Sequence, residues 1–150
     1  MYNILFVCTG NTCRSPMAAA LAAAIFEREG IKITVNSAGV SANDGSRASK
    51  NAILAMESER LDLTAHKSQT AKMEIIKEYA LVLTMTRAHL KHVKAICPDA
   101  NAFTLGEYAG TLADVSDPFG GNLQEYQNCA TQIKKLIEAC LEKFHQPPAS

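Results

Sequence analysis

The first 29 residues constrain the fold most, because they place a short polar loop between a strand-like and a helix-like segment. Residues 2–7 form an apolar run of aliphatic and aromatic side chains, which is typical of a buried strand. Residues 16–29 are rich in alanine and predict a helix. Between them, Ser15 and Pro16 predict a helix cap followed by a first-turn proline. The loop should therefore lie at a helix N-terminus, where unpaired backbone N–H groups favour an anion.

The loop, residues 8–15, carries a thiol at one end and a guanidinium near the other. The N–H groups, the helix end and Arg14 all favour the thiolate form of Cys8, which predicts a nucleophile at neutral pH. Arg14 is planar and permanently charged, so it can bind two oxygens of a phosphoryl group in the transition state. The predicted chemistry is phosphoryl transfer to sulfur, followed by hydrolysis of the thiophosphate intermediate. The phosphate is expected to be surrounded by the rest of the loop, namely Thr9, Gly10, Asn11, Thr12, Cys13 and Ser15.

Other interpretations of the loop are weaker. A buried structural cysteine near a surface arginine is the plain alternative, and the strand, the internal glycine and the helix favour a phosphate loop over it. The P-loop of nucleotide-hydrolysing enzymes requires Gly-Lys-Ser or Gly-Lys-Thr after the strand, which is missing here. A zinc site at Cys8 and Cys13 would need a second pair of ligands at suitable spacing. A phosphate-binding protein without catalysis would need no thiol at residue 8.

A thiolate attack needs a proton donor for the leaving group, and we expect this acid to be Asp117. It lies in a loop, residues 114–121, whose glycines would permit closure and whose Phe119 could form a wall of the site. Asp117-Pro118 is also a common way to begin a turn, and the loop at Cys8 favours the catalytic interpretation. Asp114 is the alternative acid, because spacing alone does not separate the two.

Downstream, strand-like and helix-like segments alternate, which is the pattern of an α/β fold with a parallel sheet. Further strands are predicted at residues 31–36, 80–85 and 102–105, and further helices at residues 46–59, 71–78, 87–96 and 123–144. A long loop is expected between the last strand and residue 121. We predict one domain over residues 1–150, a doubly wound four-stranded parallel sheet with helices on both faces and a frayed tail at 145–150. Its ligand should lie outside the carboxyl end of the first strand.

Composition favours a compact enzyme over a charged binding module. The chain has 150 residues, and its 15 Lys and Arg balance its 15 Asp and Glu, so we expect neither nucleic acid nor membrane as a partner. No apolar run approaches 18 residues, and the chain begins with a strand instead of a signal peptide, which predicts a cytoplasmic protein. Five cysteines in such a protein indicate free thiols. We expect a monomer.

Four motifs together resemble the low-molecular-weight protein tyrosine phosphatases, in matching order over essentially the whole chain. They are residues 7–18 around the loop, Asn36-Ser37-Ala38-Gly39, Thr64-Ala65-His66 and Asp117-Pro118. The resemblance implies Cys8 as nucleophile, Arg14 as phosphate clamp and Asp117 as general acid and then base. It also implies that the loop is shaped by a hydrogen-bonding set, which comprises Asn11, Ser15, Ser37 and His66. Members of the family act on phosphorylated proteins, release phosphate and need no metal or organic cofactor.

Several departures from the tyrosine-specific pattern resemble the protein-arginine phosphatase branch of the family. Thr12 replaces a bulkier aliphatic residue, Thr86 replaces Asp, and Phe119 replaces Tyr. A threonine hydroxyl could orient a phosphoramidate, whereas an isoleucine methyl would crowd that position and favour a flat phenol. We therefore expect phosphoarginine to be favoured, with Thr12 and Phe119 as selecting residues and phosphotyrosine as the alternative substrate. We have no sequence-based explanation of Ser49, which replaces a frequent proline.

Cys13 suggests a redox function. Its sulfur should lie near Cys8, so peroxide that oxidises Cys8 to the sulfenic acid could be trapped as a Cys8–Cys13 disulfide. An arsenate reductase on the same scaffold would need a further cysteine pair, and the middle of the chain offers only Cys97. The remaining histidines are expected on helical surfaces or in the tail, namely His89, His92 and His145.

Overall fold

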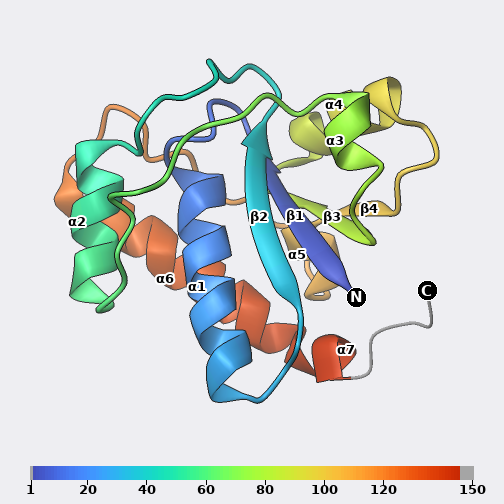
Figure 1. Cartoon of the computed structure of the whole chain (residues 1–150). Helices are drawn as coiled ribbons and strands as arrows, with labels where there is room; N and C mark the ends of the chain where they lie inside the picture. Colours follow the sequence, from blue (N-terminus) through green and yellow to red (C-terminus); the bar gives the residue numbers. More distant parts are fainter. Residues whose placement is uncertain (1, 146–150) are drawn as a thin grey trace.

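Four parallel strands form one sheet at the centre of the computed structural model, which describes residues 2–145 (Figure 1). Their order across the sheet is β2 (Thr34–Gly39), β1 (Asn3–Cys8), β3 (Leu81–Thr84) and β4 (Ala102–Thr104). The chain first moves from β1 to one side and later returns to the other, so the topological switch lies between β1 and β3. The predicted doubly wound, four-stranded parallel sheet is confirmed.

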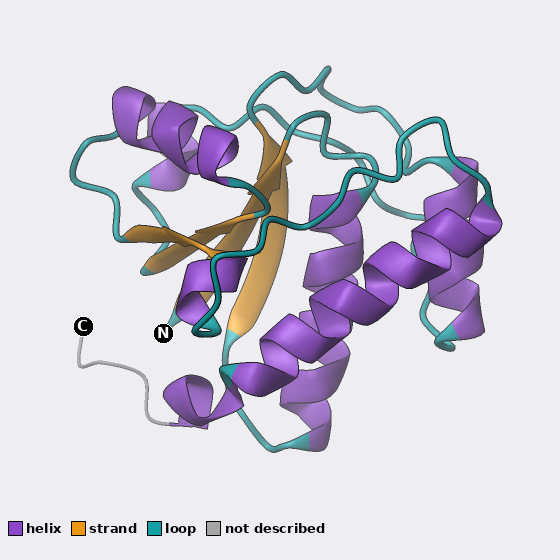
Figure 2. Cartoon of the chain, turned by 180° about the vertical axis from the view of Figure 1, so that it is seen from behind, coloured by secondary structure: helices purple, strands orange, loops and turns teal. Residues whose placement is uncertain are grey.

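Helices cover both faces of the sheet. On one face, α1 (Arg14–Arg28) lies beside α6 (Leu123–Ala139), and α2 (Lys50–Ser58) packs against both (Figures 1 and 2). On the other face lie α4 (Arg87–Ile96) and the short α3 (Met73–Ile76). None of the helices in the described part of the chain is long and apolar enough to span a membrane.

Strand β1 is apolar from Ile4 to Cys8 because both of its faces are covered there. Ile4 and Phe6 join the cluster beneath α1 and α6, whereas Leu5 and Val7 join the cluster beneath α4. All four side chains are fully buried. A strand between two helical layers needs a continuous apolar run and not an alternating one, so the sequence of β1 already suits the middle of the sheet.

Register brings the ends of three strands together at one edge. Cys8, the last residue of β1, pairs with Gly39 of β2, and Val7 pairs with Thr84 of β3. Since parallel strands point the same way, the loops that leave them meet at the carboxyl edge of the sheet, where open α/β folds bind ligands.

Several predicted boundaries were wrong. The second strand begins at Thr34 and not at residue 31, and the helix expected at 46–59 begins at Lys50, after the cap residue Ser49. The helix expected at 71–78 is only the single turn of α3. The expected loop after β4 contains α5 (Leu105–Tyr108), which begins with a capping box between Thr104 and Glu107.

The long final helix is interrupted. Helix α6 ends at Ala139, and after Cys140 the chain forms α7 (Leu141–His145). The interruption lets Phe144 pack edge-on against Phe26, with ring centroids 5.0 Å apart. Of the predicted frayed tail, only His145 is among the described residues, and it ends α7. Residues 146–150 lie outside them.

Candidate active site

The predicted nucleophile lies at the carboxyl end of the central strand. Cys8 ends β1 and is 3% exposed, and its Sγ lies 2.9 Å from the Oγ of Ser15 on the first turn of α1. A cavity of about 210 Å³ opens above it. The cavity is lined by Cys8, Thr9, Gly10, Thr12, Cys13, Arg14, Asp117 and Phe119.

The loop after Cys8 is built to hold an anion. Four of its carbonyls accept hydrogen bonds from outside the loop. The carbonyls of Cys8, Thr9 and Thr12 accept from the backbone N–H groups of Val40, Ser41 and Ser49, respectively. The carbonyl of Asn11 lies 2.7 Å from Nε2 of His66. The backbone N–H groups of residues 9–13 donate to no acceptor in the part of the chain that the structure describes. Unpaired N–H groups beside a helix N-terminus form an anion site, so the backbone itself favours a phosphate here.

Asn11 organises the loop from within. It is fully buried and adopts a left-handed backbone conformation, with φ of 57°. Its Nδ2 donates to Ser15 Oγ and Ser37 Oγ, both at 2.9 Å, and its Oδ1 accepts from the backbone N–H of Gln69. The expected set of Asn11, Ser15, Ser37 and His66 is therefore brought together, and Gln69 is an additional member that the sequence analysis missed.

Gly39 explains how the loop packs so closely on β2. A Cβ at this position would lie 2.5 Å from the carbonyl oxygen of Thr9 and 2.8 Å from the nitrogen of Asn11. Both atoms belong to the backbone of the loop, so no side-chain rotation would relieve the overlap. Only glycine allows the loop to rest on the end of β2 in this conformation.

The cap of α1 differs from the prediction. The helix begins at Arg14, its cap residue is Cys13, and no side chain caps it, so Ser15 and Pro16 are the second and third residues of the helix. Ser15 instead directs its hydroxyl toward Cys8 and Asn11. The first turn therefore faces the anion site, where a bound phosphate could take the place of a side-chain cap.

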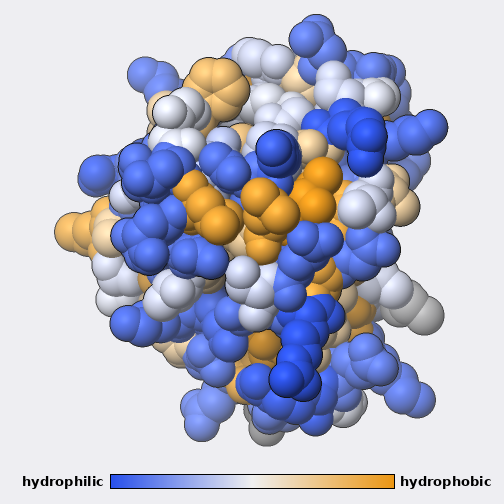
Figure 3. Space-filling model, turned by 90° about the vertical axis from the view of Figure 1, so that its left-hand side faces the viewer, coloured by the Kyte–Doolittle hydropathy of each residue, from blue (hydrophilic) through white to orange (hydrophobic). Residues whose placement is uncertain are grey.

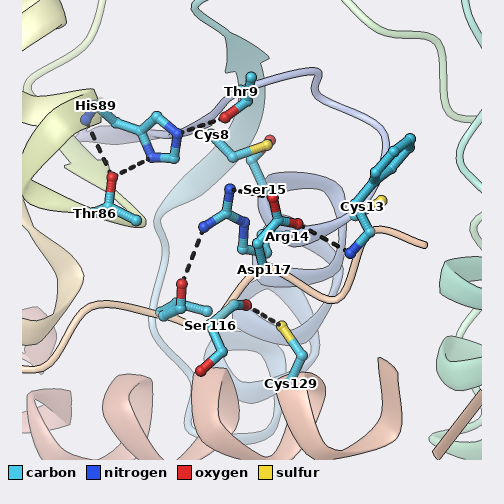
Figure 4. A network of polar contacts seen from close by, with 12 residues as sticks. Cys8, Thr9, Cys13, Arg14, Ser15, Thr86, His89, Ser116, Asp117 and Cys129 are labelled. Atoms are coloured by element: carbon cyan, nitrogen blue, oxygen red, sulfur yellow. Dashed lines mark hydrogen bonds and ion pairs between the residues drawn. The ribbon is translucent and has the colours of Figure 1, made fainter. Parts of the chain in front are cut away.

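Arg14 and Asp117 face each other across the cavity. Arg14 is 5% exposed, and its Nη1 donates to the carbonyl of Val115 at 3.0 Å. Its Nη2 lies 3.5 Å from Oδ2 of Asp117, whose side chain is 55% exposed (Figure 4). Asp114, the alternative acid, points away and accepts from the backbone N–H of Arg87. Geometry thus brings Asp117, and not Asp114, to the cavity.

Helix α6 holds the loop that carries Asp117. The side-chain amide of Gln132 accepts from the backbone N–H of Ser116 at 3.2 Å and donates to the carbonyl of Asp114 at 3.1 Å. Cys129 Sγ lies 3.5 Å from the Ser116 carbonyl oxygen. Burial raises the pKa of Cys129 to about 12, so this thiol stays protonated. None of these contacts was predicted from the sequence, because all of them join the loop to a separate helix.

Cys13 lines the cavity, and its sulfur also contacts two hydroxyl groups. Its Sγ lies 3.4 Å from the hydroxyls of both Ser49 and Tyr126, and burial raises the pKa of Tyr126 to about 12. Ser49 also accepts from the N–H of Ala52 as the cap of α2. Its presence therefore has a structural reason, since a proline could supply neither contact. All five cysteines are free thiols.

The prediction for His89 was wrong. We expected it on a helical surface, but it is only 6% exposed, and its Nε2 lies 2.8 Å from Oγ1 of Thr9 in the loop (Figure 4). The sequence offered one local signal, a threonine three residues before this histidine, because Thr86 caps α4 and also contacts the imidazole. His92 is exposed, as expected. Among the described residues, no group of three or more His, Cys, Asp or Glu side chains is placed to hold a metal ion.

The chain is similar to known proteins over almost its whole length. Residues 3–147 match the family of low molecular weight phosphotyrosine protein phosphatases. A protein-arginine-phosphatase of Geobacillus stearothermophilus is 41% identical over 146 residues, which cover 95% of this chain and 96% of that protein. The low molecular weight protein-tyrosine-phosphatase PtpB of Staphylococcus haemolyticus is 33% identical over 136 residues, covering 90% and 94%. The YwlE arginine phosphatase, solved as a cysteine-to-serine mutant with a phosphorylated active-site serine, matches with a TM-score of 0.92 and 36% identity over 97% of both chains.

Proposed function

The chain belongs to the low-molecular-weight phosphotyrosine protein phosphatase family, and from this membership we propose that it removes phosphate from phosphoarginine side chains of proteins. It is a protein phosphatase, and the proposal concerns its substrate and the roles of its residues. The observation that carries the proposal is the convergence of Cys8, Arg14 and Asp117 on one cavity, with Thr12 in its lining.

In the first step, the Cys8 thiolate attacks phosphorus in line with the leaving nitrogen. Arg14 and the free backbone N–H groups of the loop bind the three equatorial oxygens and stabilise their charge in the transition state. Asp117 donates its proton to the leaving guanidine nitrogen as the phosphorus–nitrogen bond breaks. The products of this step are unmodified arginine and a phosphocysteine.

In the second step, water displaces the sulfur. Asp117, now ionised, accepts a proton from the attacking water, and the phosphorus–sulfur bond breaks to give inorganic phosphate and the thiolate. The hydroxyl of Ser15, 2.9 Å from Cys8 Sγ, stabilises the thiolate as it leaves. The ion pair between Arg14 and Asp117 supports this scheme, because it holds the acid within reach of a phosphate that Arg14 binds.

Three observations favour phosphoarginine over phosphotyrosine. Thr12 lines the cavity, where its hydroxyl can hydrogen-bond to the phosphoramidate of the substrate. The arginine phosphatase of G. stearothermophilus also shares 41% of its residues with the chain, against 33% for the tyrosine phosphatase PtpB. Phe119 is 77% exposed at the cavity, where it can contact the substrate side chain. Phosphotyrosine is the second candidate, because PtpB matches almost as much of the chain.

The deciding experiment compares kcat/KM on one peptide scaffold that bears either phosphoarginine or phosphotyrosine. Wild type, Thr12→Ile and Cys8→Ser are measured side by side, with Cys8→Ser as the blank. We expect wild type to prefer phosphoarginine and Thr12→Ile to reverse or remove the preference, a change of about 10²-fold that corresponds to about 2.7 kcal/mol. Preference of wild type for phosphotyrosine would reject the arginine substrate but keep the mechanism. Full turnover by Cys8→Ser would reject the mechanism.

We also propose a cytoplasmic, monomeric protein. Five free thiols, one of them the proposed nucleophile, suit a reducing compartment. On the face of the molecule nearest α2, hydrophilic residues border the hydrophobic residues and divide them into separate patches, which supports the monomer (Figure 3). Equal numbers of basic and acidic residues argue against nucleic acid or anionic lipid as a partner.

A further inference from the structure

Thr9 is the loop residue next to the nucleophile, and its side chain is held by a residue 80 positions away. Oγ1 of Thr9 and Nε2 of His89 are hydrogen-bonded at 2.8 Å. The backbone of Thr9 is also fixed, because its carbonyl accepts from Ser41 N. His89 therefore contacts the loop from the side of α4, opposite to the contacts that β2 and the segment around His66 make.

The other ring nitrogen of His89 is held as well. Nδ1 lies 3.0 Å from Oγ1 of Thr86, and the same oxygen accepts from the backbone N–H of His89 as the cap of α4 (Figure 4). The hydroxyl of Thr84, at the end of β3, donates to the carbonyl of Thr86. The imidazole thus forms a rigid link from the β3–α4 junction to the phosphate loop.

This link carries no charge at neutral pH. Burial lowers the pKa of His89 to about 4, and the positive charge of Arg14 acts in the same direction. His92, on the same helix, also lowers this pKa, whereas Asp117 and Asp114 raise it. Both carboxylates lie on residues 114–121, which we call the acid loop. Both hydrogen-bond partners of the ring are hydroxyls, which satisfy a neutral imidazole because a hydroxyl can donate or accept.

We propose that His89 is a positioning residue that braces Thr9 and thereby fixes the phosphate loop beside Cys8, without adding a second cation to the site. The proposal rests on the proposed phosphatase function. Substrate and product both present a phosphate dianion to this loop, and a loop fixed in advance binds either one at a lower entropic cost. A second positive charge would also bind the phosphate product more tightly. A neutral brace therefore orders the loop and still allows phosphate to leave.

The first test separates positioning from folding. The inhibition constant of inorganic phosphate, and kcat and KM on p-nitrophenyl phosphate, are measured for wild type, His89→Ala, His89→Gln and the exposed control His92→Ala. We expect His89→Ala to weaken phosphate binding and raise KM about fivefold, as expected for one lost hydrogen bond. His89→Gln, whose amide can reach Thr9, should stay within about twofold of wild type, and His92→Ala should match wild type.

Phosphate binding by His89→Ala that equals wild type, in protein that melts cooperatively, would overturn the proposal. So would an equal loss in His89→Gln and His89→Ala, because a brace should be rescued by a residue that restores its contact. Phosphate binding can also be followed by NMR without turnover. A wild type that binds phosphate but hydrolyses no phosphorylated substrate would reject the proposed function and leave this test intact.

The second test concerns charge. Thr86→Asp keeps a good helix cap but places a carboxylate beside Nδ1 of His89, which favours the imidazolium form. We expect the ring protons of His89 to titrate between pH 6 and 8 in Thr86→Asp and not in wild type, as seen by NMR. Phosphate should bind Thr86→Asp at least about fivefold more tightly at pH 6 than at pH 8, beyond the change in wild type. Titration of His89 between pH 6 and 8 in wild type would contradict the neutral brace.

Discussion

At the scale of single residues, Asp117 and Asp114 are only three positions apart but have different surroundings. Asp117 Oδ2 faces Arg14 at 3.5 Å, and its Oδ1 accepts from the backbone N–H of Phe119. Asp114 Oδ1 instead accepts from the N–H of Arg87 and lies 3.7 Å from Nε of the same residue. One carboxylate can therefore serve the substrate, while the other ties the acid loop to α4.

Asp117→Asn should lower kcat on a phosphoarginine peptide by about 10²-fold to 10⁴-fold, because an amide can neither donate the proton nor accept it later. KM should change by no more than a few fold, since Asn keeps the shape of the side chain. Asp114→Asn is the matched control and should retain most of kcat. Steady-state kinetics decide the matter, and an equal loss in the two variants would mean that the acid has been assigned to the wrong residue.

Cys13 allows a second residue-scale prediction, which concerns oxidation. Peroxide should convert the Cys8 thiolate to a sulfenic acid, and attack by the Cys13 thiol should then form a disulfide and release water. Wild type treated with peroxide should regain its activity with a thiol reductant, whereas Cys13→Ser should remain inactive through further oxidation of Cys8. Cys97→Ser is the control and should recover. Recovery of Cys13→Ser to the level of wild type would exclude this protection.

At the scale of secondary-structure elements, the site is assembled from segments that approach one edge of the sheet. β1 supplies Cys8, and α1 supplies Arg14 and Ser15. The β3–α4 junction supplies Thr86 and His89, and α6 restrains the acid loop through Gln132. Each element contributes one or two side chains, so its orientation matters as much as its sequence.

Gln132→Ala should reduce kcat without unfolding the protein. The variant loses both hydrogen bonds that α6 makes to the backbone of residues 114 and 116, so Asp117 should spend less time at the cavity. We expect a threefold to tenfold fall in kcat, roughly the effect of one or two modest hydrogen bonds. Gln127→Ala is the control, because Gln127 lies on the same helix but bonds to Ser58. A similar fall in both variants would point to a general effect on α6.

At the scale of the whole molecule, the two sides of the sheet are linked through the site. One core cluster lies between the sheet and the helices α1, α2 and α6, and the second lies beneath α4. At the carboxyl edge, His89 on α4 contacts Thr9 in the loop before α1, and Asp114 accepts from the backbone N–H of Arg87 at the start of α4. We therefore propose that the described residues, 2–145, form one domain that unfolds as a unit.

Thermal unfolding should show a single transition, and its midpoint should depend on pH through His89. Burial lowers the pKa of His89 from 6.5 to about 4 in the folded protein, so below about pH 6.5 the unfolded chain binds a proton that the folded chain does not. This contribution to stability is complete above pH 6.5 and is lost as the pH falls toward 4. Calorimetry should show the Tm of wild type falling toward the Tm of His89→Gln as the pH is lowered from 6.5 to 4. A difference that stays constant from pH 7 to pH 4.5 would contradict the buried, neutral state of His89.

Much of the fold follows from patterns that are local in the sequence. The apolar run of β1, the loop and the alanine-rich α1 indicated a buried strand, a helix and the position of the ligand, and the alternation of later segments indicated the parallel sheet. Boundaries were less accurate where tertiary contacts decide them. Helix α6 ends at Ala139, and the chain beyond it packs Phe144 on Phe26. A capping box starts α5 within the segment that the sequence predicted to be a loop.

The sequence by itself indicated the proposed nucleophile and clamp, because Cys8 and Arg14 lie six residues apart around one loop, and it limited the proposed acid to Asp117 or Asp114. Only the tertiary structure decided which groups support them. His89, Gln69 and Gln132 reach the site through strand register and helix packing over separations of 80, 58 and 16 residues. Spacing along the chain does not reveal these contacts, even where a local feature such as the Thr86 cap precedes His89, because they depend on how α4, α6 and the segment beside the end of β2 pack around the loop.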